Sequence, residues 1–179
     1  MFYTTTYASP IGGLTLASDG ANLVGLWLEG QKYFGQSLPG GVAERDDLPL
    51  FDAVTGWLDR YFAGDRPQIA GLPLRPNGSA FRQSVWKLLC EIPYGEVTTY
   101  GEIAKRIAAQ LGRETMSGQA VGGAVGHNPI SIIIPCHRVV GANGSLTGYA
   151  GGIEKKIQLL EWEGADLTGL FIPRRGTAL

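Results

Sequence analysis

The segment from residue 128 to residue 140 constrains the fold more than any other part of this 179-residue chain. It places a run of isoleucines between two prolines, and a thiol, an imidazole and a guanidinium then follow at Cys136, His137 and Arg138. Residues 132–134 are apolar and β-branched, which predicts a short buried strand bounded by the prolines. A cysteine at the end of such a strand would be held on a rigid support.

Two interpretations of Cys136 are open on residue type alone. A free cysteine beside isoleucines is most often a small core hydrophobe, and this is what we expect of Cys90, which lies beside the apolar stripe of a predicted helix. A reactive thiol instead needs positive potential or a base nearby to form the thiolate, and the neighbouring His137 and Arg138 favour this interpretation. Because neighbouring side chains on a strand or turn point apart, a bridging water would have to link His137 to the sulfur.

The stretch Ile134-Pro135-Cys136-His137-Arg138-Val139 resembles the active-site signature of the O6-alkylguanine-DNA alkyltransferases, also called methylated-DNA–protein-cysteine methyltransferases. Four further pairs fall where the family has them: Asn128-Pro129, Gly148-Tyr149, Gly151-Gly152 and Glu163-Gly164. The resemblance is specific over residues 81–164 and general before them. It implies an α/β (α+β) fold, in which a small N-terminal domain of antiparallel sheet plus helix, ribonuclease H-like in type, precedes a helix-turn-helix or winged-helix-like alkyltransferase domain.

The same resemblance implies a reaction. It is the direct, stoichiometric transfer of an alkyl group, such as methyl, from O6 of guanine in DNA, or from O4 of thymine, to the enzyme's own cysteine, without a cofactor or a metal. Because a thioether is a very poor leaving group, one molecule would repair one lesion. The implied partner is double-stranded DNA that carries the lesion, contacted in its minor groove with the damaged base turned out of the duplex.

The resemblance also implies a role for each matched residue. A relay of Glu163, His137 and a water would activate Cys136. Tyr100 would donate to N3 of the guanine, and Asn128 would buttress the active-site turn. The residues implied to line the base pocket are Val139, Tyr149, Ala150 and Gly151. Those implied to contact DNA are Thr99, Gln119, Ala120, Gly122, Gly123 and Arg138.

Two of the matched positions depart from the family's pattern. Gln119 stands where the family often has an arginine that fills the gap left by the extruded base. Ala150 stands where it often has a serine, which removes one possible donor to O6. These departures leave the reaction rate and the preferred alkyl group open, although the small Gly151-Gly152 pair predicts room for groups larger than methyl.

Alternation of apolar residues and turn signals divide the chain into two parts. The strands and the helix predicted for the first part lie at 3–7, 14–17, 23–28 and 50–62. A stretch rich in proline and glycine follows, at residues 70–78. We therefore expect a structural domain at 1–75, a DNA-binding and catalytic domain at 76–165, and a loosely held tail at 166–179.

Side-chain caps predict two helices joined by a short turn in the second part, which is the anatomy of a helix-turn-helix. Thr99 and Glu102 have the spacing of a capping box, and Ser117 can cap a helix over 118–125. Flanking helices are predicted over 79–92 and 153–162. The helix over 118–125 offers almost no side chain for reading bases. Its glycines could allow close approach of its backbone to DNA, or only tight packing on a neighbouring helix.

The net charge is −1, and the charges divide unevenly along the chain. Residues 1–75 hold five basic and eight acidic side chains, while residues 76–179 hold ten and eight. DNA affinity would therefore rest on a local patch and on backbone amides, with a modest salt dependence. The sequence has two cysteines, which lack zinc-like spacing, and it has neither a long apolar run nor a basic, apolar leader. These features predict a cytoplasmic protein without a membrane partner. We expect it to act as a monomer.

Two other classes of protein fit parts of the pattern. A non-catalytic protein that binds alkylated DNA, or a regulatory helix-turn-helix protein, would tolerate another residue at position 136. A thiol hydrolase could use Cys136 and His137, but adjacent residues do not suit a directly bonded pair, and no oxyanion-hole loop is visible beside the nucleophile. Alkyl transfer to Cys136 is the function that we expect.

Overall fold

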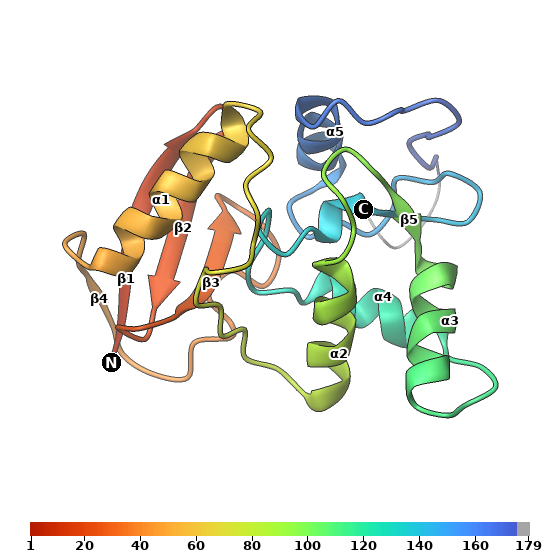
Figure 1. The fold of residues 1–179 in the computed structure, drawn as a ribbon, viewed down its shortest axis with the longest axis horizontal. Coiled ribbons are helices and arrows are strands. Elements are labelled where there is room, and N and C mark those ends of the chain that lie inside the picture. The colour runs from red at the N-terminus through yellow and green to blue at the C-terminus, as the bar shows by residue number, and fades with distance from the viewer. Residues whose placement is uncertain (175–179) are drawn as a thin grey trace.

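The computed structural model describes residues 1–174, in which a sheet covered by a helix lies beside a group of helices (Figure 1). The sheet has the strand order β3-β2-β1-β4. Its strands are β1 (Phe2–Ser9), β2 (Gly12–Ser18), β3 (Leu23–Leu28) and β4 (Val42–Glu44). The first three are the predicted strands and form an antiparallel meander, whereas β4 pairs in parallel with β1. The three residues of β4 are too few to show alternation, so the sequence did not predict this strand.

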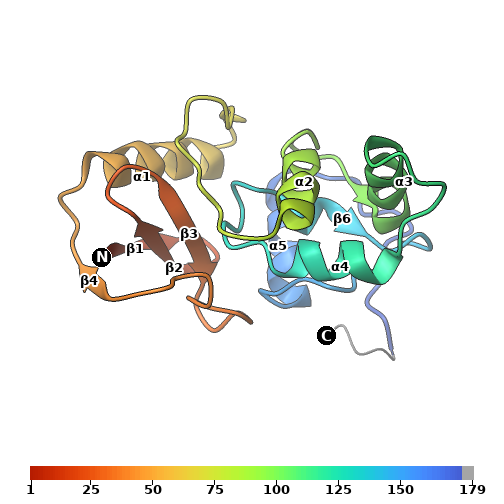
Figure 2. The ribbon, with the colours of Figure 1, turned by 90° about the horizontal axis from the view of Figure 1, so that it is seen from below.

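Helix α1 (Pro49–Phe62) lies across one face of the sheet, as two perpendicular views show (Figures 1 and 2). It begins at Pro49, where a proline costs nothing because the first amide of a helix has no partner within it. Its apolar residues fall on the buried face, and they are Leu50, Phe51, Val54, Trp57, Leu58 and Tyr61. The helix is therefore fixed by burial, as its spacing predicted.

Strand β3 is buried along its whole length because the remainder of the chain covers its free edge. At one end the amide of Leu23 donates to the carbonyl of Pro73 at 2.8 Å. Further along, Leu26 donates to Pro129 and accepts from Ser131, both at 2.9 Å. The segment that leads to Cys136 is thus attached by its backbone to the sheet.

Up to residue 174, the helical part contains four α-helices. They are α2 (Ala80–Leu89), α3 (Tyr100–Gln110), α4 (Gly118–Gly126) and α5 (Ile153–Trp162). The three predicted caps form, since Ser79, Thr99 and Ser117 each accept the backbone amide three residues later at 3.1–3.3 Å. Helix α2 stops earlier than predicted, at Leu89, and a short turn carries the chain to Pro93.

Residues 132–134 do not form a strand, so that prediction is wrong. They run through tight turns into the 3-10 helix η1 (Cys136–Arg138), and the parallel pairing that follows joins β5 (Thr98–Thr99) to β6 (Val139–Val140). The tail is held more firmly than expected up to Phe171, which pairs with Ser145. Its last part, residues 175–179, lies outside the described residues.

One continuous hydrophobic cluster joins the sheet, α1 and the helical part. It includes Leu26 of β3, Val54 of α1, Val121 of α4 and the buried isoleucines that precede Cys136. Among residues 1–174, no helix is long and apolar enough to cross a membrane. The two parts therefore share a core, and the candidate site lies where they meet.

Candidate active site

Two successive γ-turns carry the chain to Cys136. In the first, the amide of Ile133 donates to the carbonyl of Ser131 at 2.8 Å, and Ile132 between them has a φ of 70°. In the second, Cys136 donates to Ile134 at 2.8 Å across Pro135, whose φ of −83° and ψ of 64° are those of an inverse γ-turn. A β-branched residue at positive φ costs about 1–2 kcal/mol, so its surroundings must hold Ile132 in place.

The side chain of Asn128 spans this turn from within. Its amide nitrogen donates to the carbonyls of Ile130 at 3.2 Å and Ile134 at 2.8 Å, and its oxygen accepts from the amide of Ile130 at 3.0 Å. Asn128 is buried, so these bonds are shielded from water. They fix the carbonyl two residues before Cys136.

The buried carboxylate of Glu163 is the centre of a hydrogen-bond network below the turn. Its Oε2 accepts from Nε2 of His137 at 2.6 Å, and its Oε1 accepts from Nε of Arg138 at 2.7 Å. The backbone amide of Gly95 also donates to Oε1, at 3.1 Å. Glu163 follows the last turn of α5, and Gly164 with a φ of 70° then ends the helix.

The network sets the charge states of Glu163 and His137. Burial acts to raise the pKa of Glu163, but hydrogen bonds from His137 and Arg138 and the positive charge of Arg138 outweigh it and hold this pKa well below its usual range. Burial lowers the pKa of His137, so the imidazole is neutral near pH 7. An ionised Glu163 accepts the Nε2 proton, which leaves the lone pair on Nδ1. Nδ1 is buried and has no hydrogen-bond partner within the described chain.

The resting thiol of Cys136 is protonated. Burial raises its pKa, while a hydrogen bond from Asn128 and the positive charge of Lys156 act in the opposite direction without outweighing burial. The sulfur therefore needs a base before it can react. The neutral imidazole with a free Nδ1 is such a base.

Lys156 is a buried cation that the sequence reasoning missed. Its Nζ donates to the carbonyls of Val139 at 2.5 Å and Thr147 at 3.0 Å, and burial lowers its pKa to about 8. The Tyr100 hydroxyl donates to the same Thr147 carbonyl at 3.0 Å. Both residues act electrostatically on Cys136. The signal was present in the sequence, because Lys156 falls on the inward stripe of α5 between Ile153 and Leu160.

Access to Cys136 is closed in this conformation, in which the residue is 4% exposed. A pocket of about 160 Å³ opens near it between α4 and the loop at residues 148–150, lined by Gly122, Gly123, Tyr149 and Ala150 among others. Cys136 is not among its lining residues. Of the predicted base-pocket residues, Tyr149 and Ala150 line this pocket, Gly151 is not among its lining residues, and Val139 is buried on β6.

The exposed face of α4 is made of backbone and small residues. Gln119, Ala120 and Gly123 are exposed, and Gly122 is half-buried. A Cβ added at Gly122 or Gly123 would meet no atom within 4 Å. The alternative that these glycines allow tight helix packing is therefore wrong. Thr99 is half-buried and serves as the N-cap of α3.

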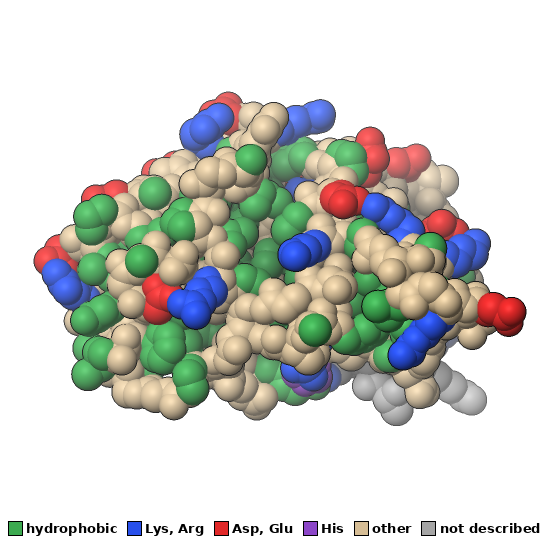
Figure 3. Space-filling view, turned by 60° about the horizontal axis from the view of Figure 1, so that its bottom comes forward, with side chains coloured by type: hydrophobic (Ala, Val, Ile, Leu, Met, Phe, Trp, Pro, Cys, Tyr) green, Lys and Arg blue, Asp and Glu red, His purple; other side chains and the backbone are tan. Residues whose placement is uncertain are grey.

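The predicted contact of Arg138 with DNA is wrong. Its guanidinium is buried, bound to both carboxylate oxygens of Glu163, and donates to the carbonyl of Ile92 at 2.6 Å. Arg138 is thus a structural cation of the network. The face that contains α2, α3 and α4 shows charges of both signs scattered over it, with no large basic patch (Figure 3). Within residues 1–174, no group of three His, Cys, Asp or Glu side chains could hold a metal ion.

Fold and site together define a two-part α+β thiol enzyme with a helix-turn-helix. A family model described as "6-O-methylguanine DNA methyltransferase, DNA binding domain" matches residues 80–165, and one described as "6-O-methylguanine DNA methyltransferase, ribonuclease-like domain" matches residues 2–76. The chain belongs to the 6-O-methylguanine DNA methyltransferase family.

Similar proteins agree with this placement. The chain is 44% identical over 161 residues to the methylated-DNA–protein-cysteine methyltransferase of Haemophilus influenzae, covering 90% of this chain and 86% of that protein. It is 45% identical over 172 residues to the protein of that name from Mycobacterium tuberculosis, covering 94% and 98%. A crystal structure of Mycobacterium tuberculosis OGT in complex with DNA matches with a TM-score of 0.76 at 44% identity, covering 90% of this chain and 92% of that one.

Proposed function

We propose that Cys136 receives the alkyl group when this DNA-repair methyltransferase acts, and that the lesion is O6-alkylguanine. The observation that carries the assignment is the hydrogen-bonded pair of Glu163 and His137, which leaves a free Nδ1 on the residue next to the cysteine. Cys90 lies at the end of α2, and burial raises its pKa to about 11. Because burial raises the pKa of both thiols, the neighbouring imidazole, and not the pKa, favours Cys136 as the nucleophile.

In the proposed reaction the proton of the Cys136 thiol passes through a water to Nδ1 of His137. The imidazolium that forms is stabilised by Glu163, which remains ionised. The thiolate sulfur then attacks the alkyl carbon on O6, so that a carbon–sulfur bond forms as the carbon–oxygen bond breaks. The electron pair of the broken bond stays on the guanine. The adduct at Cys136 is a thioether, which nothing in this reaction removes.

Tyr100 is the proposed hydrogen-bond donor to N3 of the departing guanine. Burial raises the pKa of its hydroxyl, so the group stays protonated, and it needs only to exchange the Thr147 carbonyl for N3 of the base. Gly148 supports this role, since a Cβ there would lie 2.5 Å from the Tyr100 hydroxyl oxygen. A side chain at Gly148 would displace the donor.

The proposed DNA contact is made by α4 in the minor groove, with the damaged base turned into the site. The open glycine face of α4 and the exposed Gln119 support this arrangement, because backbone can approach DNA closely there. Because Cys136 is 4% exposed, a base could reach the sulfur only if the groups that cover it move aside, and we propose that Tyr149 and Ala150 are among them. The glycines at 148 and 152, both at positive φ, can act as the hinges.

The assignment of functions to segments of the chain is also a proposal. Residues 1–75 would be the structural domain, 76–165 the DNA-binding and catalytic domain, and 166–179 the tail. We further propose that the protein acts as a monomer in the cytoplasm. No cofactor takes part in the proposed chemistry.

Intact-protein mass spectrometry tests the assignment. The protein is incubated with a duplex that contains one O6-methylguanine, and the expected result is a gain of one methylene per molecule, on the peptide that contains Cys136. Cys136→Ala should show no gain, while Cys90→Ser should react like the wild type. Turnover beyond one equivalent, or methylation of Cys136→Ala, would overturn the proposal.

A further inference from the structure

The carboxylate of Glu163 has a further partner from the distant N-terminal part of the chain. Tyr61, in the last turn of α1, is fully buried, and its hydroxyl donates to Oε2 of Glu163 at 2.6 Å. This is the same oxygen that accepts from Nε2 of His137 at 2.6 Å. One oxygen atom thus joins a phenol of the sheet layer to the imidazole beside Cys136.

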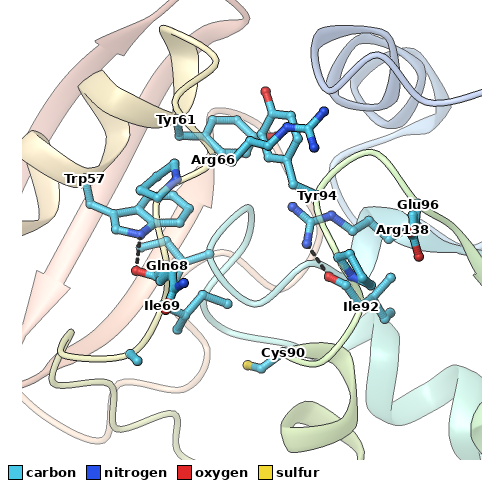
Figure 4. A pocket seen from close by; sticks show the side chains of 14 residues that line it. Trp57, Tyr61, Arg66, Gln68, Ile69, Cys90, Ile92, Tyr94, Glu96 and Arg138 are labelled. Carbon is cyan, nitrogen blue, oxygen red and sulfur yellow. Dashed lines mark hydrogen bonds between the residues drawn. The ribbon is translucent and has the colours of Figure 1, made fainter.

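The aromatic surroundings hold Tyr61 in this orientation. Its ring stacks on Trp57 at 5.5 Å and meets the edges of Phe62 at 5.0 Å and Tyr94 at 5.5 Å. Figure 4 shows Tyr61 and Tyr94 beside each other among the residues that line the pocket between the two parts of the chain, with Arg138 next to Tyr94. The phenol is therefore a fixed donor.

The Tyr61 hydroxyl stays protonated, because burial and the neighbouring carboxylate both raise its pKa. A donor on Oε2 takes up part of the negative charge that this oxygen would otherwise offer to the imidazole. The imidazolium form of His137 is then stabilised less than it would be by a carboxylate free of the phenol. The strength of this hydrogen bond consequently sets how basic Nδ1 is.

We propose that Tyr61 is a positioning residue for alkyl transfer, through which the N-terminal part of the chain sets the basicity of His137. The inference rests on the proposed function of Glu163 and His137. It gives the ribonuclease-like domain a part in the chemistry, although it holds no reacting group. Tyr61 acts through Glu163 and touches neither the thiol nor the base.

The test is the pH dependence of single-turnover methyl transfer in Tyr61→Phe. Loss of the donor should raise the pKa of His137, so the acid limb of the profile should move to higher pH by about half to one unit. The ring of phenylalanine fills the same space, and Glu163 keeps Arg138, His137 and Gly95 as donors. A thermal melt checks that the variant remains folded.

Tyr94→Phe is the matched control. It removes a hydroxyl from the same aromatic cluster, but one that reaches the carbonyl of Trp162 at 3.5 Å and not Glu163. Its acid limb should match that of the wild type. Equal shifts in both variants would mean a general packing effect and would overturn the inference.

A titration of the imidazoles by NMR separates this inference from the proposed function. The sequence has two histidines, and His127 serves as an internal reference because it stacks on Tyr33 near the surface. His137 should titrate at higher pH in Tyr61→Phe than in the wild type, whether or not the protein is alkylated. An unchanged titration refutes the role of Tyr61, whereas a wild type that titrates as expected but takes up no methyl group refutes the proposed function.

Discussion

Replacement of Gly123 by alanine should make the protein more stable and at the same time weaken its binding to DNA. Gly123 lies inside α4, is exposed, and an added Cβ would meet no atom within 4 Å. Glycine in a helix interior costs about 0.8–1.0 kcal/mol relative to alanine. The free energy of unfolding should rise by about this amount, and the melting temperature by about 2–4 °C for a chain of this size.

The expected loss of DNA affinity follows from the proposed approach of the α4 backbone to the duplex. A methyl group between the helix and a phosphate would remove about one hydrogen bond to a charged group, which is about 1.5–3 kcal/mol. The dissociation constant should therefore rise by about ten- to a hundredfold. Fluorescence anisotropy with a labelled duplex at one fixed salt concentration measures it.

Gly56→Ala is the control for this prediction. Gly56 is an exposed residue in the middle of α1, its added Cβ would also meet nothing within 4 Å, and α1 covers the sheet away from α4 (Figure 1). The two variants should be stabilised alike, and only Gly123→Ala should lose affinity. If both bind DNA as the wild type does, α4 is not the helix that contacts the duplex.

Three further predictions concern the charged groups of the site. Glu163→Gln should slow alkylation and lower the free energy of unfolding by about 3 kcal/mol, because Arg138 loses its ionised partner; equal stability in denaturant titrations would contradict this. Folding lowers the pKa of Glu163 from 4.5, so its ionised form stabilises the folded protein fully above pH 4.5. This contribution should fade as the pH falls through the lower pKa of the folded state. Acid unfolding of the wild type compared with that of Glu163→Gln measures the difference. Burial lowers the pKa of Lys156 to about 8 in the folded state, from 10.5 in the unfolded chain. The wild type should therefore gain stability relative to Lys156→Met as the pH rises from about 8 to 10.5. Curves of unfolding free energy against pH that run parallel for the two proteins would refute the burial argument.

Local signals predicted most of the secondary structure. The three serine and threonine caps are short-range features, and the meander follows from alternation and turns. The isoleucine run before Cys136 misled because its β-branched residues favour a strand, whereas Asn128 and the pairing of Leu26 with Ile130 hold it in turns. That pairing is a long-range feature, which no local pattern contains.

The site was predicted in part, and the errors have a common cause. His137 and Glu163 are brought together as the resemblance implied. Arg138 was assigned to DNA by the resemblance, and only the fold shows that Glu163 lies within 2.7 Å of it. Tyr61 is 102 positions from its partner, so its role depends on the docking of the two parts.

The protection of the β3 edge determines how a truncated form of the protein behaves. This strand is apolar throughout and stands at the end of the sheet, where an uncovered row of amides and carbonyls would pair with other chains. Residues 73–75 and 129–131 occupy that row. A fragment that ends before residue 129 would expose half of it, and such a fragment should aggregate even though every strand of its sheet is present.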